Sequence, residues 1–574
     1  MSIIDWVIMC GFLLFVVAYG TWKTKSTKTI NGFIRANRSA PWYIVTISVM
    51  ATQASAITFL STPGQAYTDG MRFVQFYLGL PIAMIILSIT AVPIFHRLNI
   101  YTAYEYLEKR FDLKNRVLGS VLFLTQRGLA AGFTIFAPAL ILSVILGWNI
   151  DFAIFVMGGL VIIYTTVGGS VAVNKTHILQ MIIIMTGMVI AFFVIISLFP
   201  PDISFKDAAY VAGKMGKLNA IDFSFDLNDR YTFWSGIIGG TFLMLSYFGT
   251  DQSQVQRYLG GSSVKQSRMG LLANGIVKIP MQFFILLTGA MVFVFFQFVT
   301  PPLFFNPVQE NKVKSGIYSE QYKQLEEKYH ALNEEKQQHL RGMLSSIDEG
   351  NTLNTDLEQE KVQSIHKEEM QTRESALALI KEANPGADLN DTNYIFLNFV
   401  IHYLPIGLIG LVLASILSAS MSSTSAELNA LASTTVIDFY KRLIKKDASE
   451  AHYLKVSKIA TILWGIYAIG FALFANRLGT LIEAVNILGS LVYGTILGLF
   501  LVAFYLKKVK GTPTFYSALI AELAVLYCFF FTKIPFLWFN VIGCLLVIFL
   551  ALIFNTFVVT KKVKRDSHAS PGRR

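Results

Sequence analysis

Runs of apolar residues, each long enough to form a membrane-spanning helix, recur along the whole chain and are separated by shorter polar segments. An α-helix needs about 20 such residues to cross the hydrocarbon core of a bilayer, and we count about 13 runs of this kind. The first run, 3–22, begins beside Asp5 and is followed by no small-residue cleavage site, so we expect a retained span rather than a signal peptide. The pattern predicts an all-α, polytopic membrane protein.

The polar loops alternate in charge. The segment after the first span, 23–38, is strongly basic, and so are further alternate loops and the tail, 561–574. Because cytoplasmic loops are enriched in Lys and Arg, this alternation predicts an N-terminus outside and a C-terminus in the cytoplasm. We therefore expect a multi-pass protein of the plasma membrane, which is the inner membrane in a bacterium.

One long segment breaks this pattern. From about Asn306 to Asn393 the chain is rich in Glu, Lys and Gln, which are strong helix formers, and has no long apolar run. The segment is predicted to form an outward-projecting hairpin of two helices, Ser319–Ser346 and Leu357–Ala383. Apolar residues at steps of three and four indicate that the helices pack on each other. A soluble receptor module is the alternative, and we find no catalytic constellation in the segment.

The second expected span, Pro41–Tyr67, has an unusual centre. Residues Ala51–Ala56 are small or polar at the depth where a spanning helix is normally richest in Leu and Ile. In lipid, a backbone that stops pairing with itself is tolerated only where it lines a cavity or is buried in protein. We expect a helix interrupted at a binding site. The alternative is a close-packing interface of small residues.

The ninth expected span, Tyr394 to about Tyr440, concentrates hydroxyl groups between Ser415 and Ser425. A lipid-facing helix does not normally carry so many polar side chains. Neutral carbonyl and hydroxyl oxygens suit a hard cation such as sodium, because they bind it weakly enough to release it. The alternative is that these hydroxyls only bond back to their own helix.

Composition supports a membrane protein and excludes other classes. Apolar residues make up 54% of the chain and charged residues 15%. The net charge of +12 lies mainly in loops, so we expect a lipid bilayer rather than nucleic acid as the partner, and no obligate protein partner. The three cysteines lie in apolar runs and form no disulfide or zinc pattern. No HExxH, GxSxG or paired-carboxylate arrangement occurs, so we do not expect an enzyme.

Several motifs occur together in a fixed order. They are the interrupted second span, GGSVAV before the sixth span, GTDQSQVQRY at the end of the seventh, and SASMSSTSAELNALASTTVIDFYKR in the ninth. In this order and spacing the chain resembles the sodium:solute symporter family, which includes the sodium–glucose and sodium–iodide cotransporters. The resemblance covers roughly 1–300 and 393–510.

The resemblance implies a LeuT-like fold of two inverted five-helix repeats that begins at Pro41. We therefore expect a first extra helix and loop (1–40), the first repeat and the start of the second (41–300), the hydrophilic insertion (301–392), the rest of the second repeat (393–510), and two extra helices with the basic tail (511–574).

The resemblance also implies a sodium site. Its ligands would be the carbonyls of Ala51, Ala54 and Ala419 and the hydroxyls of Ser422 and Ser423. Members of the family that bind a second sodium carry an Asp in the sixth span and paired hydroxyls beyond the first site. This chain has His177 at the Asp position and Ala426 beside Ser425, so we expect one sodium per transport cycle. His177 is either a proton-coupling group or a solvated residue at a helix end.

The residues that bind the solute are less clearly specified. Resemblance to the sugar-transporting branch places contacts at Thr58, Tyr77, Asp251, Lys278 and Asn486. QSQVQRY and APAL instead resemble the branch that carries monocarboxylates, vitamins and iodide. The guanidinium of Arg127 is either a clamp for a carboxylate or a structural partner of Glu427 or Asp251. Gln75 and Gln254 are further polar candidates.

These features predict a sodium-coupled symporter that imports a small polar organic solute by alternating access, with a sugar or polyol favoured. One alternative is a symporter of a small anion such as a monocarboxylate. Another, from a different functional class, is a transporter-like nutrient sensor whose outward hairpin binds a partner.

Overall fold

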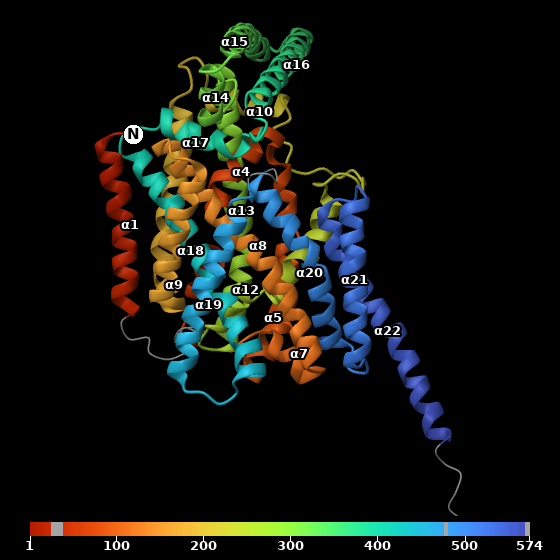
Figure 1. Cartoon of the computed structure of the whole chain (residues 1–574). Helices are drawn as coiled ribbons and strands as arrows, with labels where there is room; N and C mark the ends of the chain where they lie inside the picture. The colour runs from red at the N-terminus through yellow and green to blue at the C-terminus, as the bar shows by residue number, and fades with distance from the viewer. Residues whose placement is uncertain (25–37, 476–479, 569–574) are drawn as a thin grey trace, which may run out of the picture.

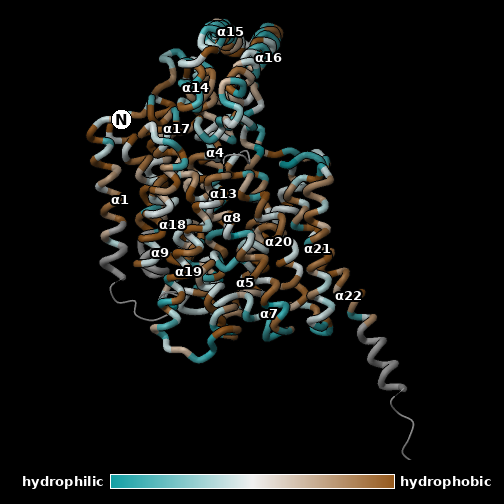
Figure 2. Tube along the Cα trace, viewed as in Figure 1, coloured by the Kyte–Doolittle hydropathy of each residue, from teal (hydrophilic) through white to brown (hydrophobic). Residues whose placement is uncertain are grey.

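The computed structural model describes residues 1–24, 38–475 and 480–568, except for the side chains of 17, 20–24, 168–176 and 558–568. The basic loop 25–37 and the last residues of the predicted cytoplasmic tail lie outside the described residues. Helices form one bundle, with α1 (Ile3–Thr24) at one side and α22 (Phe536–His568) at the other (Figure 1). Figure 2 shows apolar residues concentrated along the bundle and polar residues at its two ends and on the insertion.

Within the described part of the chain, ten helical stretches are long and apolar enough to cross a membrane, and two of them lie in the single helix α9. Two further apolar helices are shorter, Ile3–Val16 and Ser235–Gly249, and the second expected span is divided into two pieces. The ten long stretches, the two shorter helices and the first piece of the second span together make up the expected 13 spans. The long helices of the bundle are α5 (Leu80–Ile89) with α6 (Ala91–Leu98), α8 (Leu113–Leu146), α9 (Ile150–Ser197), α13 (Val264–Phe298), α18 (Leu408–Thr434), α19 (Glu450–Ala472), α20 (Leu481–Tyr505) and α21 (Gly511–Phe531).

The predicted interruption of the second span is confirmed. It consists of α3 (Trp42–Gln53) and α4 (Ala56–Asp69), with Ala54 and Ser55 between them. Ser55 has an extended backbone, and its hydroxyl accepts a hydrogen bond from the amide of Ile57 at 3.2 Å. The serine therefore caps a new helix instead of continuing the old one.

The ninth expected span was placed too long. Its first part is a separate helix, α17 (Thr392–Tyr403), which ends before Pro405, and α18 begins only at Leu408. Gly407 has φ of +90°, a conformation that favours glycine. Asp5 of α1 accepts hydrogen bonds from the amides of Gly407, at 2.7 Å, and Gly410, at 3.1 Å. These contacts satisfy amides at the start of α18 and fasten α1 against it.

The insertion forms the predicted helical hairpin. It contains α14 (Pro307–Lys314), α15 (Ser319–Asp348) and α16 (Thr352–Ala383), and it lies at the same end of the bundle as the N-terminus (Figure 1). Tyr322, Tyr329 and Ile380 are buried in its own apolar cluster, and Lys336 pairs with Glu369 at 2.5 Å. The end of α22 extends beyond the opposite end of the bundle, as an odd number of spans requires.

Shorter elements connect the long helices at both ends. At the end of the bundle that carries the insertion lie η2 (Gly70–Tyr77), which leads from α4 to α5, and α10 (Phe205–Lys214). The seventh span is formed by η3 (Ser235–Gly239), α11 (Gly240–Gly249) and α12 (Gln252–Leu259). At the opposite end, α7 (Tyr104–Arg110), the start of α8 and η4 (Thr435–Ile444) are joined by ion pairs of Arg116 with Asp438, at 2.6 Å, and with Glu108, at 2.7 Å.

Candidate functional site

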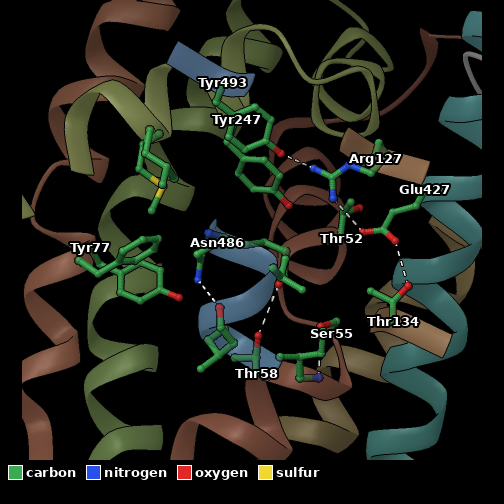
Figure 3. A pocket seen from close by; sticks show the side chains of 17 residues that line it. Thr52, Ser55, Thr58, Tyr77, Arg127, Thr134, Tyr247, Glu427, Asn486 and Tyr493 are labelled. Atoms are coloured by element: carbon green, nitrogen blue, oxygen red, sulfur yellow. Dashed lines mark hydrogen bonds and ion pairs between the residues drawn. The ribbon is translucent and has the colours of Figure 1, made fainter. Parts of the chain in front are cut away.

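A cavity of ≈80 Å³ lies beside the interruption between α3 and α4. This volume holds several water molecules. Its lining comes from the interrupted second span, η2, α8, α11, α18 and α20, and Figure 3 shows these side chains around it. Its lining consists of Thr52, Gln53, Ser55, Ile57, Thr58, Phe76, Tyr77, Arg127, Thr134, Leu243, Met244, Tyr247, Glu427, Ile482, Val485, Asn486 and Tyr493. We call this cavity the inner pocket.

Four of the residues predicted to bind the solute line the inner pocket: Thr58, Tyr77, Arg127 and Asn486. The Thr58 hydroxyl lies 3.5 Å from the carbonyl of Gln53, in the interrupted turn. Asn486 uses its amide nitrogen to donate to the carbonyl of Ile482 at 2.7 Å. No hydrogen bond in the described part of the chain uses the Asn486 amide oxygen, which leaves an acceptor for a solute.

Arg127 on α8 is the centre of a buried charged cluster. Its guanidinium donates to Asp251 Oδ2 at 3.0 Å, to Glu427 Oε1 at 2.9 Å and to the Tyr493 hydroxyl at 2.5 Å. The other Glu427 oxygen accepts from Thr134 at 3.0 Å, as Figure 3 shows. Both structural partners expected as alternatives to a carboxylate clamp are therefore present, and the charge of Arg127 is already matched within the protein.

Asp251 lies behind the pocket lining rather than in it. It is the N-cap of α12, where its side chain accepts from the amide of Ser253 at 2.8 Å. The other carboxylate oxygen accepts from Arg127 and, at 2.8 Å, from Tyr493. Gln254 is likewise outside the lining and donates to the Tyr247 hydroxyl at 2.6 Å. Both residues therefore contact side chains that line the pocket but do not line it themselves.

Gln75 and Lys278 also lie outside the pocket lining. Gln75 donates to the carbonyl of Tyr231 at 2.8 Å and accepts from the amide of Asp222 at 2.8 Å, so it anchors the loop before η3. Lys278 is fully buried on α13, with its ammonium 5.7 Å from the centroid of the Tyr77 ring. Within the described residues its ammonium has no hydrogen-bond partner.

The residues expected to bind sodium lie at the interrupted span and on α18, and all are buried. In the described chain, no backbone amide donates to the carbonyls of Ala51 and Ala54. The Ser55 N–H bonds to Gln53 instead, at 3.1 Å, and the Thr58 N–H bonds to Ser55, at 3.0 Å. The Ser423 hydroxyl donates to the carbonyl of Ala419 at 3.1 Å. The Ser422 hydroxyl is buried with no partner among the described residues. The five-residue site stays a prediction, but α3 and α4 pack against α18, and the carbonyls of Ala51 and Ala54 are free of backbone bonds within the described residues.

Other hydroxyls of α18 hold neighbouring helices. Ser420 donates to the carbonyl of Thr134 on α8 at 2.6 Å, and Ser418 accepts from Gln180 on α9 at 2.9 Å. Ser425 accepts from Thr165 on α9 at 2.8 Å. Three hydroxyls of the cluster therefore join α18 to α8 and α9, whereas Ser415 and Ser423 bond back to their own helix.

His177 is not the solvated residue that one of the two alternatives described. It is fully buried, and its Nδ1 lies 3.2 Å from the hydroxyl of Ser48 on α3. Ser48 lies one turn before Ala51, so His177 supports the helix that leads into the interruption.

Several residues of the inner pocket were not predicted from the sequence. Glu427, Thr134, Tyr247 and Tyr493 line it without having been expected there. Glu427 carries a signal that identifies it, because a carboxylate one turn after Ser423 in an apolar span needs a partner or a cavity. The tyrosines carry no such signal in the sequence.

The comparisons with known proteins agree with this architecture. The model of the sodium:solute symporter family matches residues 33–314 and 373–521, which leaves most of the hairpin unmatched. The human sodium/iodide cotransporter is 30% identical over 52% of this chain. A sodium/sialic acid symporter of Proteus mirabilis is 25% identical over 95% of this chain and 93% of its own length.

A solved structure has the same fold over nearly the full length. It is the substrate-bound, outward-open state of a Na⁺-coupled sialic acid symporter, with a TM-score of 0.72 and 23% identity over 97% of this chain and 98% of the other. The chain spans only 46% of the length of the human sodium/iodide cotransporter.

Proposed function

Because this chain belongs to the sodium:solute symporter family, we propose that it imports a small, neutral, hydroxyl-bearing organic solute, a sugar or polyol, together with one sodium ion. The sodium gradient and the membrane potential favour inward movement, and each charge gains roughly 2.3 kcal/mol per 100 mV. The inner pocket binds the solute, and the interruption between α3 and α4 binds the ion.

The observation that carries the proposal is the arrangement of carbonyls and hydroxyls at the interruption. The carbonyls of Ala51 and Ala54 accept no backbone hydrogen bond within the described chain, and the unpartnered Ser422 hydroxyl lies on the packed helix α18. A buried polar oxygen without a partner is costly, and a bound cation removes that cost. Sodium at this position joins α3 to α18 and thereby shapes the inner pocket, which α3, α4 and α18 help to line.

The lining of the inner pocket supports a neutral solute. Thr58, Tyr77, Asn486 and Tyr247 supply neutral donors and acceptors, which a site for hydroxyl groups requires. Arg127 is already bonded to two carboxylates, so a solute carboxylate would have to displace Asp251 or Glu427.

A carboxylate-bearing solute is the second candidate. Arg127 does line the inner pocket, and a relative that matches 95% of this chain is named as a sodium/sialic acid symporter. In that case Arg127 exchanges one protein carboxylate for the carboxylate of the solute, because a guanidinium can bind two oxygens side by side.

The experiment is thermal stabilisation of the purified protein by a panel of hexoses, polyols and small organic acids, in sodium and in potassium buffer. A ligand that binds only the folded state raises the unfolding temperature. We expect stabilisation by a sugar or polyol in sodium only, followed by sodium-driven uptake of that compound into proteoliposomes. Stabilisation without uptake would instead favour the nutrient sensor.

A further inference from the structure

A second and larger cavity, of ≈620 Å³, lies between the insertion and the end of the bundle that carries it. We call it the outer cavity. The bundle contributes the end of α4, the loop after α10, and the end of α13, and the insertion contributes α15 and α16. The lining includes Tyr67, Asp69, Lys217, Phe293, Gln297, Tyr329, Lys336, Glu369, Arg373 and Asp391.

The outer cavity lies beyond the inner pocket along α4. Thr58 lines the inner pocket, and Tyr67, nine positions later on the same helix and about 14 Å further along it, lines the outer cavity. The family model does not match 315–372, so Tyr329, Lys336 and Glu369 belong to the part of this chain that the family pattern lacks.

The charges in the outer cavity balance. Three cationic side chains (Lys217, Lys336, Arg373) face three carboxylates (Asp69, Glu369, Asp391) in its lining. Lys336 pairs with Glu369 at 2.5 Å, and Arg373 pairs with Asp391 at 2.5 Å. A solute without net charge therefore fits this cavity better than an anion or a cation.

Several polar groups of the outer cavity have unused hydrogen-bonding capacity. Gln297 is 2% exposed, and its side-chain oxygen has no partner among the described residues. The hydroxyls of Tyr67 and Tyr329 make no hydrogen bond in the described part of the chain. Lys217 donates to the carbonyl of Thr68 and forms no ion pair within the described residues, which leaves ammonium protons for a solute.

Aromatic rings provide the apolar part of the outer cavity. Tyr67 packs edge-on against Phe293, with ring centroids 5.4 Å apart, and the Lys217 ammonium lies 4.6 Å from the Phe293 centroid. A carbohydrate presents apolar C–H faces and many hydroxyls, and each hydroxyl both donates and accepts. Rings beside unsatisfied amide, hydroxyl and ammonium groups match that chemistry.

We propose that the outer cavity is a second binding site, independent of sodium, for a neutral carbohydrate of one or two sugar units. The site holds the solute at the outer end of α4 before it reaches the inner pocket. Its relation to transport rests on the proposed function, whereas the binding itself does not.

The test is calorimetric titration of the full-length protein in potassium buffer without sodium, with D-glucose, D-galactose, sucrose, sorbitol and glycine betaine as probes. We expect at least one of the carbohydrates to bind. Tyr329→Phe is expected to weaken this binding about 2- to 10-fold, the range of one lost hydrogen bond, and Lys217→Met by at least about tenfold. Tyr322→Phe is the matched control, because its hydroxyl bonds to Glu310 on the same insertion, at 3.1 Å, and lies outside the cavity.

Three results would overturn the proposal: no sodium-independent binding, binding that neither Tyr329→Phe nor Lys217→Met weakens, or binding of glycine betaine alone. A different result separates this site from the proposed function. If carbohydrate binds in potassium and both variants weaken it, but sodium adds no second binding event, the outer site stands and the sodium-coupled inner site fails.

Discussion

The Nη1 atom of Arg127 lies 2.9 Å from Oε1 of Glu427, although the two residues are 300 positions apart in the chain. Together with Asp251, this pair joins α8, α12 and α18 around the inner pocket. The cluster has one guanidinium for two carboxylates, so removing the guanidinium leaves two buried negative charges.

Replacement of Arg127 by Ala should therefore destabilise the protein strongly. Loss of one partner of a buried ion pair costs about 3–5 kcal/mol. We expect a lower unfolding temperature for Arg127→Ala in detergent. Adding Glu427→Gln should recover part of the loss, because it removes one of the two buried negative charges that Arg127→Ala leaves unpaired. Wild-type stability in Arg127→Ala would contradict the cluster described here.

The nature of the solute follows from a comparison of two variants. Asn486→Ala removes an acceptor from the pocket lining and should weaken binding of a sugar or polyol about 2- to 10-fold. Arg127→Lys keeps the positive charge but not the planar fork, so it should affect a neutral solute less than a carboxylate. Competition binding in sodium measures both. A larger loss with Arg127→Lys than with Asn486→Ala would favour the acidic solute.

One sodium ion should accompany each solute. The resemblance places His177 where family members with a second sodium carry an Asp, and the structure buries it against Ser48. Sodium activation of uptake should have a Hill coefficient of 1, and a neutral solute should carry in one positive charge per cycle. A coefficient near 2, or two charges per solute, would show that a second site exists.

The stability of the outer loops should depend on pH above neutrality. Burial lowers the pKa of Lys217 from its ordinary value of 10.5 to about 8, and nearby Asp69 opposes this shift. Between pH 8 and 10.5 the unfolded chain binds more protons than the folded chain, so the free energy of unfolding should rise with pH in that window. Thermal unfolding at pH 8 and 9.5 tests this.

Lys217→Met should reduce that rise. Lys214→Met is the matched control, since this lysine is three positions earlier and more exposed, on α10. If the unfolding temperature of both variants depends on pH to the same extent, Lys217 does not cause the dependence.

Much of the architecture could be predicted from the sequence. Small and polar residues in Ala51–Ala56 predicted the interruption, and α3 and α4 confirm it. The three- and four-residue spacing of the insertion predicted the hairpin of α15 and α16. The family match confirms the resemblance, the all-α membrane fold and the expectation of a transporter rather than an enzyme.

The rest depended on contacts that no local pattern specifies. The partners of Arg127 are 124, 300 and 366 positions away, so residue spacing cannot select them. The break between α17 and α18 did have a signal in the sequence, Pro405 followed by Gly407. The continuous apolar run around it nevertheless predicted one long span. His177 is polar at the end of an apolar run, which suggested solvent, but packing against α3 buries it.

The most direct measurement is sodium-driven uptake by Ser422→Ala/Ser423→Ala in proteoliposomes, compared with Ser433→Ala. Ser433 is buried on the same helix and bonds back to the carbonyl of Asn429 at 2.7 Å, as Ser423 does to Ala419. If the α3–α4 interruption and α18 bind the ion, the double variant loses sodium-dependent uptake and the control keeps it. Undiminished sodium-dependent uptake by the double variant would contradict the account.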